Sequence, residues 1–88
     1  RWSAIMKVTF KLYALLGKYL PAGAKKNEIE LELDEGTTVA DLLRQHAVPK
    51  EMCHLVLING SFVPPGARDT AALHDGDAVA VWPPVAGG

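Results

Sequence analysis

The sequence predicts an α+β roll, in which one main helix lies across one face of a mixed sheet of four to five strands. Apolar and polar residues alternate along Lys7–Tyr13 and Glu28–Asp34, which is the two-residue period of a strand. Residues 38–49 instead place apolar side chains at helical spacing. Short apolar runs typical of strands follow, at Leu55–Ile58 and Ala78–Trp82. The order strand, strand, helix and three more strands is typical of such a roll.

Length and charge narrow the classes of function. The 88 residues suit one domain. Nine basic and ten acidic residues give a net charge of −1, so we expect no nucleic-acid partner. No apolar stretch approaches the roughly 20 residues that span a bilayer, so we expect no membrane partner. The single cysteine, Cys53, and the absence of a leader pattern favour a cytoplasmic location.

The first two strand patterns predict an antiparallel pair. We expect residues 1–5 to be an N-terminal extension outside the fold, for which an origin in cloning is one explanation, because the strand pattern begins at Met6. Residues 6–82 form the predicted domain, and residues 83–88 form an extended C-terminal tail. The inward side chains are Val8, Phe10 and Leu12 in the first strand and Ile29, Leu31 and Leu33 in the second. If the strands pair antiparallel, the outward glutamates lie beside Lys7 and Lys11.

A capped helix follows these strands. Thr38 and Asp41 have the spacing of a capping box, and Pro49 marks the end of the pattern. The apolar stripe consists of Val39, Leu42, Leu43 and Ala47. A shorter helical turn is compatible with residues 14–19, before Pro21.

The second half of the chain predicts a hairpin and a last strand. Leu55–Ile58 leads through the favoured turn Asn59-Gly60 into a short strand that begins at Ser61. Asp75-Gly76-Asp77 is a further turn signal, and Ala78–Trp82 follows as a strand. The first and last strands carry strong apolar faces and are placed centrally. If these two neighbour each other in parallel, the fold is a β-grasp.

No set of residues predicts a catalytic or metal site. The three histidines, His46, His54 and His74, lack the spacing of metal ligands. Cys53 has no base or orienting group that would make it a nucleophile, so we interpret it as a buried structural cysteine. No glycine-rich loop leads from a strand into a helix, so the chain is not expected to bind a nucleotide.

The tail is the most informative segment. Pro83-Pro84 stiffens the chain after Trp82, and the glycines Gly87 and Gly88 present bare backbone that a partner's active site can enclose. A frayed terminus is the alternative. The candidate tail and partner-binding residues are Trp82, Pro83, Pro84, Val85, Ala86 and Gly87, with Gly88 as the reacting residue.

Residues 75–88 read Asp-Gly-Asp, an apolar strand, Pro-Pro-Val and a final Gly-Gly. This pattern resembles the MoaD/ThiS family of ubiquitin-like sulfur carriers, most closely the small-subunit branch of molybdopterin synthase. The resemblance implies a ubiquitin-like β-grasp fold and a carrier that is not itself an enzyme and holds no cofactor. It also implies that an E1-like adenylyltransferase uses ATP to adenylate the Gly88 carboxylate.

In this family, sulfur from the persulfide of a sulfurtransferase or cysteine desulfurase then displaces AMP, and the final product is a thiocarboxylate on Gly88. The resemblance further implies that the large molybdopterin synthase subunit receives this sulfur for the dithiolene that holds molybdenum or tungsten.

Other functions stay open. The compact segment Val48–His54 is closer to a thiamine-type carrier, whereas Pro83-Pro84 and the long first hairpin, Ala14–Asn27, argue against that branch. A protein modifier joined to lysine through Gly88, or a plain binding module, are further alternatives. We expect the sheet face opposite the helix to be the docking surface, with Trp82 directed outward as an anchor. The alternative is that Trp82 merely covers the sheet edge or packs on Tyr13.

Overall fold

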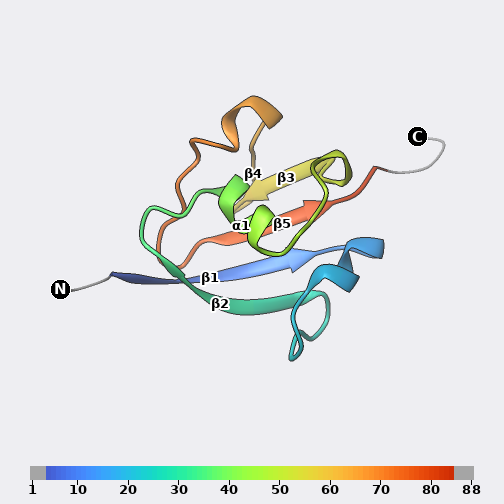
Figure 1. The fold of residues 1–88 in the computed structure, drawn as a ribbon, viewed down its shortest axis with the longest axis horizontal. Helices are drawn as coiled ribbons and strands as arrows, with labels where there is room; N and C mark the ends of the chain where they lie inside the picture. The colour runs from blue at the N-terminus through green and yellow to red at the C-terminus, as the bar shows by residue number, and fades with distance from the viewer. Residues whose placement is uncertain (1–3, 85–88) are drawn as a thin grey trace.

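The computed structural model describes residues 4–84. Five strands, one α-helix and three short 3-10 helices follow one another in these residues (Figure 1). Their bounds in chain order are β1 (Ile5–Leu12), η1 (Ala14–Tyr19), β2 (Glu28–Asp34), α1 (Val39–Gln45), η2 (Lys50–Met52), β3 (Leu55–Ile58), β4 (Ser61–Phe62), η3 (Pro65–Ala67) and β5 (Ala78–Trp82).

The five strands form one mixed sheet in the order β2-β1-β5-β3-β4. β1 and β5 are parallel neighbours at its centre, and the other pairs are antiparallel. α1 lies across one face of this sheet, as Figure 1 shows. The predicted β-grasp roll, with the first and last strands central, is confirmed.

The pairing of β1 with β2 has the predicted charge pattern. Lys7 lies opposite Glu32, and Lys11 lies opposite Glu28. The strand nevertheless starts one residue earlier than predicted, because Ile5 pairs with Asp34 and the Glu35 amide donates to the Ala4 carbonyl at 3.0 Å. The domain boundary after residue 5 is therefore corrected, since the end of β2 still offers backbone partners there.

The core lies between α1 and the sheet. Val8, Phe10 and Leu12 of β1 are fully buried, as are Val79 and Val81 of β5. In β2 the predicted inward residues differ in burial: Leu33 is buried, whereas Ile29 and Leu31 are only partly buried. This difference fits the position of β2 at the edge of the sheet.

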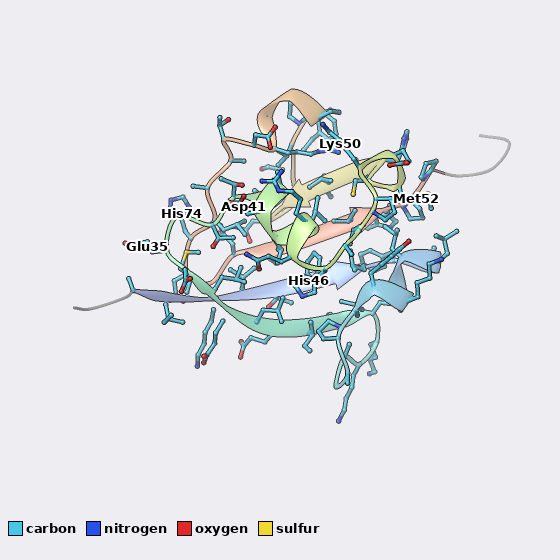
Figure 2. All side chains as sticks on the ribbon, in the orientation of Figure 1. Glu35, Asp41, His46, Lys50, Met52 and His74 are labelled. Atoms are coloured by element: carbon cyan, nitrogen blue, oxygen red, sulfur yellow. The ribbon has the colours of Figure 1, made fainter. Side chains whose placement is uncertain are left out.

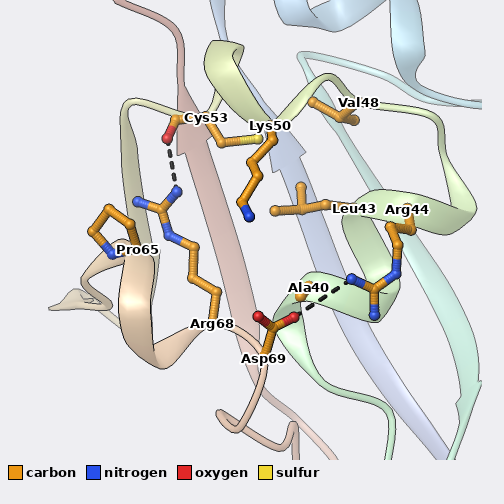
Figure 3. Close-up of a pocket in the computed structure, with 9 residues that line it drawn as sticks. All are labelled: Ala40, Leu43, Arg44, Val48, Lys50, Cys53, Pro65, Arg68 and Asp69. Atoms are coloured by element: carbon orange, nitrogen blue, oxygen red, sulfur yellow. Dashed lines mark hydrogen bonds and ion pairs between the residues drawn. The ribbon is translucent and has the colours of Figure 1, made fainter.

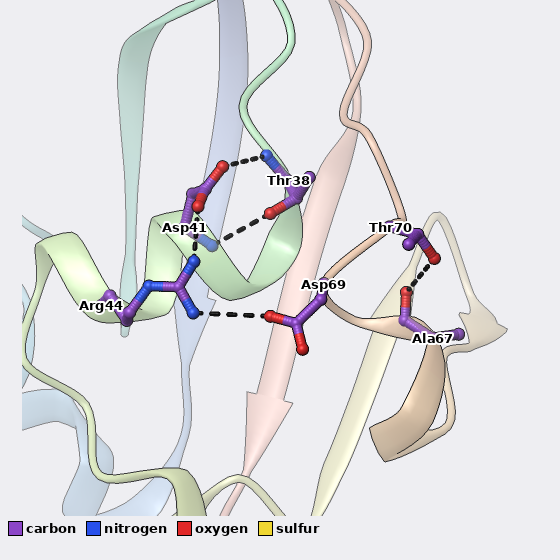
Figure 4. Close-up of polar contacts among 6 residues, drawn as sticks. All are labelled: Thr38, Asp41, Arg44, Ala67, Asp69 and Thr70. Atoms are coloured by element: carbon purple, nitrogen blue, oxygen red, sulfur yellow. Dashed lines mark hydrogen bonds and ion pairs between the residues drawn. The ribbon is translucent and has the colours of Figure 1, made fainter.

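The start of α1 follows the predicted capping box (Figure 4). The Asp41 amide donates to Thr38 Oγ1 at 3.1 Å, and the Thr38 amide donates to Asp41 Oδ2 at 3.1 Å. Arg44 then donates to Asp41 at 2.6 Å and to Asp69 at 3.4 Å, which ties the helix to the segment after η3.

The end of α1 differs from the prediction. Ala47, expected on the buried stripe, is exposed and has φ +57°. The Ala47 amide donates to the Arg44 carbonyl and the Val48 amide to the Leu43 carbonyl, which is the Schellman pattern of helix ends. Because that pattern requires a left-handed residue after the cap, Ala47 leaves the helical stripe and Val48 takes the buried position.

Candidate functional site

Val81 and Trp82, which precede the C-terminal tail, are hydrogen-bonded to backbone amides on both sides of β5. The Tyr13 amide donates to the Val81 carbonyl at 3.1 Å, and the His54 amide donates to the Trp82 carbonyl at 3.0 Å. Trp82 also pairs with Leu55 of β3. The chain is therefore held from both sides, by Tyr13 and by the segment His54–Leu55, up to the last residue of β5.

The Trp82 side chain packs on Tyr13, the residue that follows β1. Their ring centroids are 4.4 Å apart and their planes differ by 9°, so the rings are stacked. Both side chains remain partly exposed. The packing on Tyr13 that the sequence left as an alternative is thus present, and part of the indole is still accessible to a partner.

The two prolines have different surroundings. Pro83 is buried, and Pro84 is exposed. Because a proline fixes its own φ near −65°, these residues restrict how the chain departs from β5. The site predictions for Val85, Ala86, Gly87 and Gly88 lie outside the described residues.

The sheet face opposite α1 carries an apolar patch. Leu57 lies opposite Ala80 of β5 on one side and Phe62 of β4 on the other, and residues opposite each other point to the same face. Phe62 has 57% of its surface exposed. We call this the open-face patch; it consists of Leu55, Leu57, Phe62, Ala78, Ala80 and Trp82.

Sequence reasoning named Trp82 but missed Leu57 and Phe62 as members of this patch. A signal for them was present, because a two-residue turn at Asn59-Gly60 makes Leu57 and Phe62 cross-strand neighbours. Asn59 and Gly60 have φ of +52° and +85°, as a type I′ hairpin turn requires.

In the described residues, no hydrogen bond joins the Cys53 thiol to a histidine side chain. Cys53 is buried, its Sγ donates to the Pro49 carbonyl at 3.4 Å, and burial raises its thiol pKa. His46 contacts the Leu42 carbonyl and the Phe10 ring, well away from His74 (Figure 2). Within residues 4–84, no group of three or more metal-ligating side chains is close enough to hold an ion. In the same residues, no helix has the length and apolar character to cross a bilayer.

Residues 19–88 match the ThiS family. The chain belongs to the ThiS family. Among solved structures, this family member is similar to the HVO 2177 protein of Haloferax volcanii, with 31% identity over 96% of this chain and 88% of that chain and a TM-score of 0.68. Among curated proteins, no sequence gives a significant match.

Two further solved structures are similar to this ThiS-family chain. One is a Pyrococcus furiosus protein assigned as molybdopterin converting factor, subunit 1, with 30% identity, 91% and 99% coverage of the two chains and a TM-score of 0.63. The other is small archaeal modifier protein 1 from Methanosarcina acetivorans, with 26% identity, 97% and 99% coverage and a TM-score of 0.66.

The fold also occurs in a complex. A structure of subunits 1 and 2 of the molybdopterin-converting factor from Helicobacter pylori matches this ThiS-family chain with 16% identity, 94% and 100% coverage and a TM-score of 0.56. At this identity the likeness concerns the fold alone.

Proposed function

We propose that this chain is a sulfur carrier whose Gly88 carboxylate becomes a thiocarboxylate. The observation that carries the proposal is the sequence Pro83-Pro84-Val85-Ala86-Gly87-Gly88 directly after a central strand of a ThiS-family fold. β5 supplies a fixed base for that segment, because its last residue, Trp82, pairs with β3, accepts a hydrogen bond from the His54 amide and stacks its ring on Tyr13.

The chemistry explains why such a carrier needs partners. An ionised carboxylate is a poor electrophile, so ATP first converts Gly88 into an acyl-adenylate with release of pyrophosphate. A persulfide sulfur then displaces AMP, and a thiol reductant cleaves the S–S bond to leave the thiocarboxylate. We propose that an E1-like adenylyltransferase binds the ATP, and that a sulfurtransferase or cysteine desulfurase supplies the persulfide.

Molybdopterin synthesis is the pathway we propose for the sulfur. The similarity to the Pyrococcus furiosus converting-factor subunit supports it. In this pathway the acceptor lies in the large synthase subunit, and the open-face patch is the surface we propose for docking that subunit. The patch supports this role because it joins Phe62 and Leu57 to Trp82 at the base of the tail.

A protein modifier is the second candidate. The similarity to small archaeal modifier protein 1 favours it, at a TM-score comparable to that of the converting-factor subunit. In this case the activated Gly88 carbonyl is attacked by a lysine amine of another protein, which forms an isopeptide bond. The two candidates share the adenylated intermediate and differ in the nucleophile that consumes it.

One experiment separates these outcomes. The chain is purified from its native cells and its intact mass is measured, and the purified chain is then incubated with the E1-like partner, ATP and a persulfide donor. Replacement of one oxygen by sulfur supports the carrier, and an isopeptide-linked conjugate supports the modifier. Absence of AMP release and of both products would refute activation of Gly88.

A further inference from the structure

A cavity of about 380 Å³ (Figure 3) lies on the helix side of the sheet, and the open-face patch lies on the other side. It is bounded by α1, by the segment from Val48 through η2 to Cys53, and by η3 with the two residues after it. This volume is in the range of small-molecule sites. Its lining residues are Ala40, Leu43, Arg44, Val48, Lys50, Cys53, Pro65, Arg68 and Asp69.

The lining is cationic, although the chain as a whole has a net charge of −1. Its charged residues are Arg44, Lys50, Arg68 and Asp69, which sum to +2 when each carries its ordinary charge. Arg44 is occupied, since it is paired with Asp69 and with Asp41. Within residues 4–84, neither Lys50 nor Arg68 forms an ion pair with a carboxylate.

Arg68 is the unusual member of this set, because only 7% of it is exposed. Its Nη1 donates to the Cys53 carbonyl at 2.8 Å, and its Nε donates to the Val63 carbonyl at 3.2 Å. Nη2 is buried and has no hydrogen-bond partner in the described part of the chain. A buried cation without a counterion is costly, so an anion beside Arg68 would be favoured.

Lys50 provides a second cation for the same space. In Figure 3 its side chain extends from η2 into the region between Arg68 and Leu43. Hydrocarbon side chains complete the lining: Leu43 and Val48 lie on the side away from Arg68, and Pro65 lies beside Arg68 in Figure 3. A ligand that fills this cavity therefore needs a negative end and an apolar body.

We propose that this cavity binds a small organic carboxylate. The carboxylate lies on the side of Lys50 and Arg68, where it offsets the guanidinium charge, and the hydrocarbon body packs on Leu43 and Val48. Inorganic phosphate fits the charges but leaves the apolar walls without contacts. Among the described residues, neither Pro83 nor Pro84 lines this cavity, so we expect the site to act independently of Gly88 activation.

The test uses the full-length ¹⁵N-labelled chain and sodium benzoate as the probe, with amide chemical shifts as the readout. We expect saturable shifts at the amides of Leu43, Val48 and Cys53, with a Kd on the order of 1 mM. Benzyl alcohol lacks the charge, and acetate and phosphate lack the ring, so each is expected to bind at least about tenfold more weakly, which corresponds to roughly 1.4 kcal/mol.

Single substitutions test whether Lys50 and Arg68 bind the carboxylate of benzoate. Lys50→Met keeps the aliphatic stem and is expected to weaken benzoate binding at least about fivefold, whereas Lys7→Met, on the opposite face of the sheet, removes the same charge and leaves binding unchanged. Arg68→Lys tests the buried cation, with unfolding monitored to separate loss of fold from loss of binding. Benzoate binding that is absent, matched by benzyl alcohol, acetate or phosphate, or unaffected by Lys50→Met would overturn the proposal.

Discussion

Cys53 illustrates how one residue connects two parts of the fold without supplying chemistry. Its carbonyl accepts from Arg68 and its Sγ donates to Pro49, while burial raises the thiol pKa. A raised pKa keeps the thiol protonated at neutral pH, and the protonated form is a poor nucleophile.

We therefore predict that the Cys53→Ala chain forms the Gly88 thiocarboxylate in the same yield as the parent chain. The backbone bond to Arg68 survives this change, so we expect a destabilisation of only about 1 kcal/mol from the lost side-chain packing. Thiocarboxylate yield by mass spectrometry and urea unfolding check the two parts. A natively folded Cys53→Ala chain that fails to accept sulfur would place chemistry on the thiol.

Trp82 joins the tail base to the open-face patch, so its indole can act in packing and in partner binding. We predict that Trp82→Ala weakens binding to the E1-like enzyme or the large synthase subunit by more than about 1 kcal/mol, as an aromatic anchor would. Titration calorimetry measures this change. Tyr13→Phe serves as the control, because it keeps the aromatic ring available for stacking. Equal affinities for the Trp82→Ala and parent chains would remove the anchor role.

At the scale of the helix, Ala47 occupies a position that favours glycine. Its φ of +57° costs an alanine about 1 kcal/mol or more, because the Cβ crowds the backbone in the left-handed region. The amide bonds that end the helix, from Ala47 and Val48, depend on that conformation.

We predict that Ala47→Gly raises the free energy of unfolding by about 0.5–1 kcal/mol, since relief of strain exceeds the extra entropy of the unfolded chain. The matched control is Ala40→Gly in the first turn of α1, which should lower stability by a similar amount. Chemical denaturation of both variants measures the sign of each change in the free energy of unfolding. Destabilisation by Ala47→Gly would contradict the strained helix end.

The capping box at the start of α1 makes the free energy of unfolding depend on pH through Asp41. The pKa of Asp41 is lowered, first by the hydrogen bond from the Thr38 amide and next by the one from Arg44. A lowered native pKa means that ionised Asp41 stabilises the fold above the ordinary carboxyl pKa of roughly 3.9. This contribution is lost as pH falls through the lowered native value.

We predict that Asp41→Asn removes this part of the pH dependence, because an amide oxygen still accepts from Thr38 but does not titrate. Unfolding free energies measured over the acid range should differ between Asp41→Asn and parent chains at neutral pH and converge at low pH. Curves that stay parallel throughout the range would show that Asp41 contributes no native pKa shift.

The regular elements were predictable because local pattern and tertiary environment agree. β2, β3 and β5 have the predicted limits, and the Thr38 cap forms as the residue types indicate. Ala47 was misplaced because its helical spacing was counted beyond the last turn. The cavity at Arg68 was not predictable, since residues 64–77 lack a hydrophobic period and burial of Arg68 depends on carbonyls of Cys53 and Val63.

The whole molecule separates two surfaces across one sheet. The parallel pairing of β1 and β5 places the end of β5 beside Tyr13, at the centre of the sheet. The open-face patch lies on one side of the sheet, and α1 with its cavity lies on the other. We therefore expect a partner docked on the patch to leave the cavity accessible, so that benzoate and partner binding are independent.

The position of Gly88 relative to this fixed base is the quantity on which the carrier function should depend. Deletion of Gly88 shortens the reach by roughly 3.3–3.6 Å, and a displacement of about 1 Å can already cost on the order of a hundredfold in rate. A C-terminal tag replaces the free carboxylate with an amide. We predict that both changes abolish ATP-dependent AMP release with the E1-like partner.

Gly87 tests the width of the segment rather than its length. We predict that Gly87→Ala and Gly87→Val reduce AMP release and thiocarboxylate yield in the order of side-chain size, because the partner must enclose bare backbone. Thermal stability should not change, since the described core lies between Met6 and Val81. Gly66→Ala is the control, because an added Cβ there meets open space in the described structure.

Two outcomes would contradict these predictions for the tail. If the tagged chain or the chain without Gly88 still forms the thiocarboxylate at the parent rate, Gly88 is not the reacting residue. If only variants that also unfold lose activity, the loss reflects the fold and not the tail.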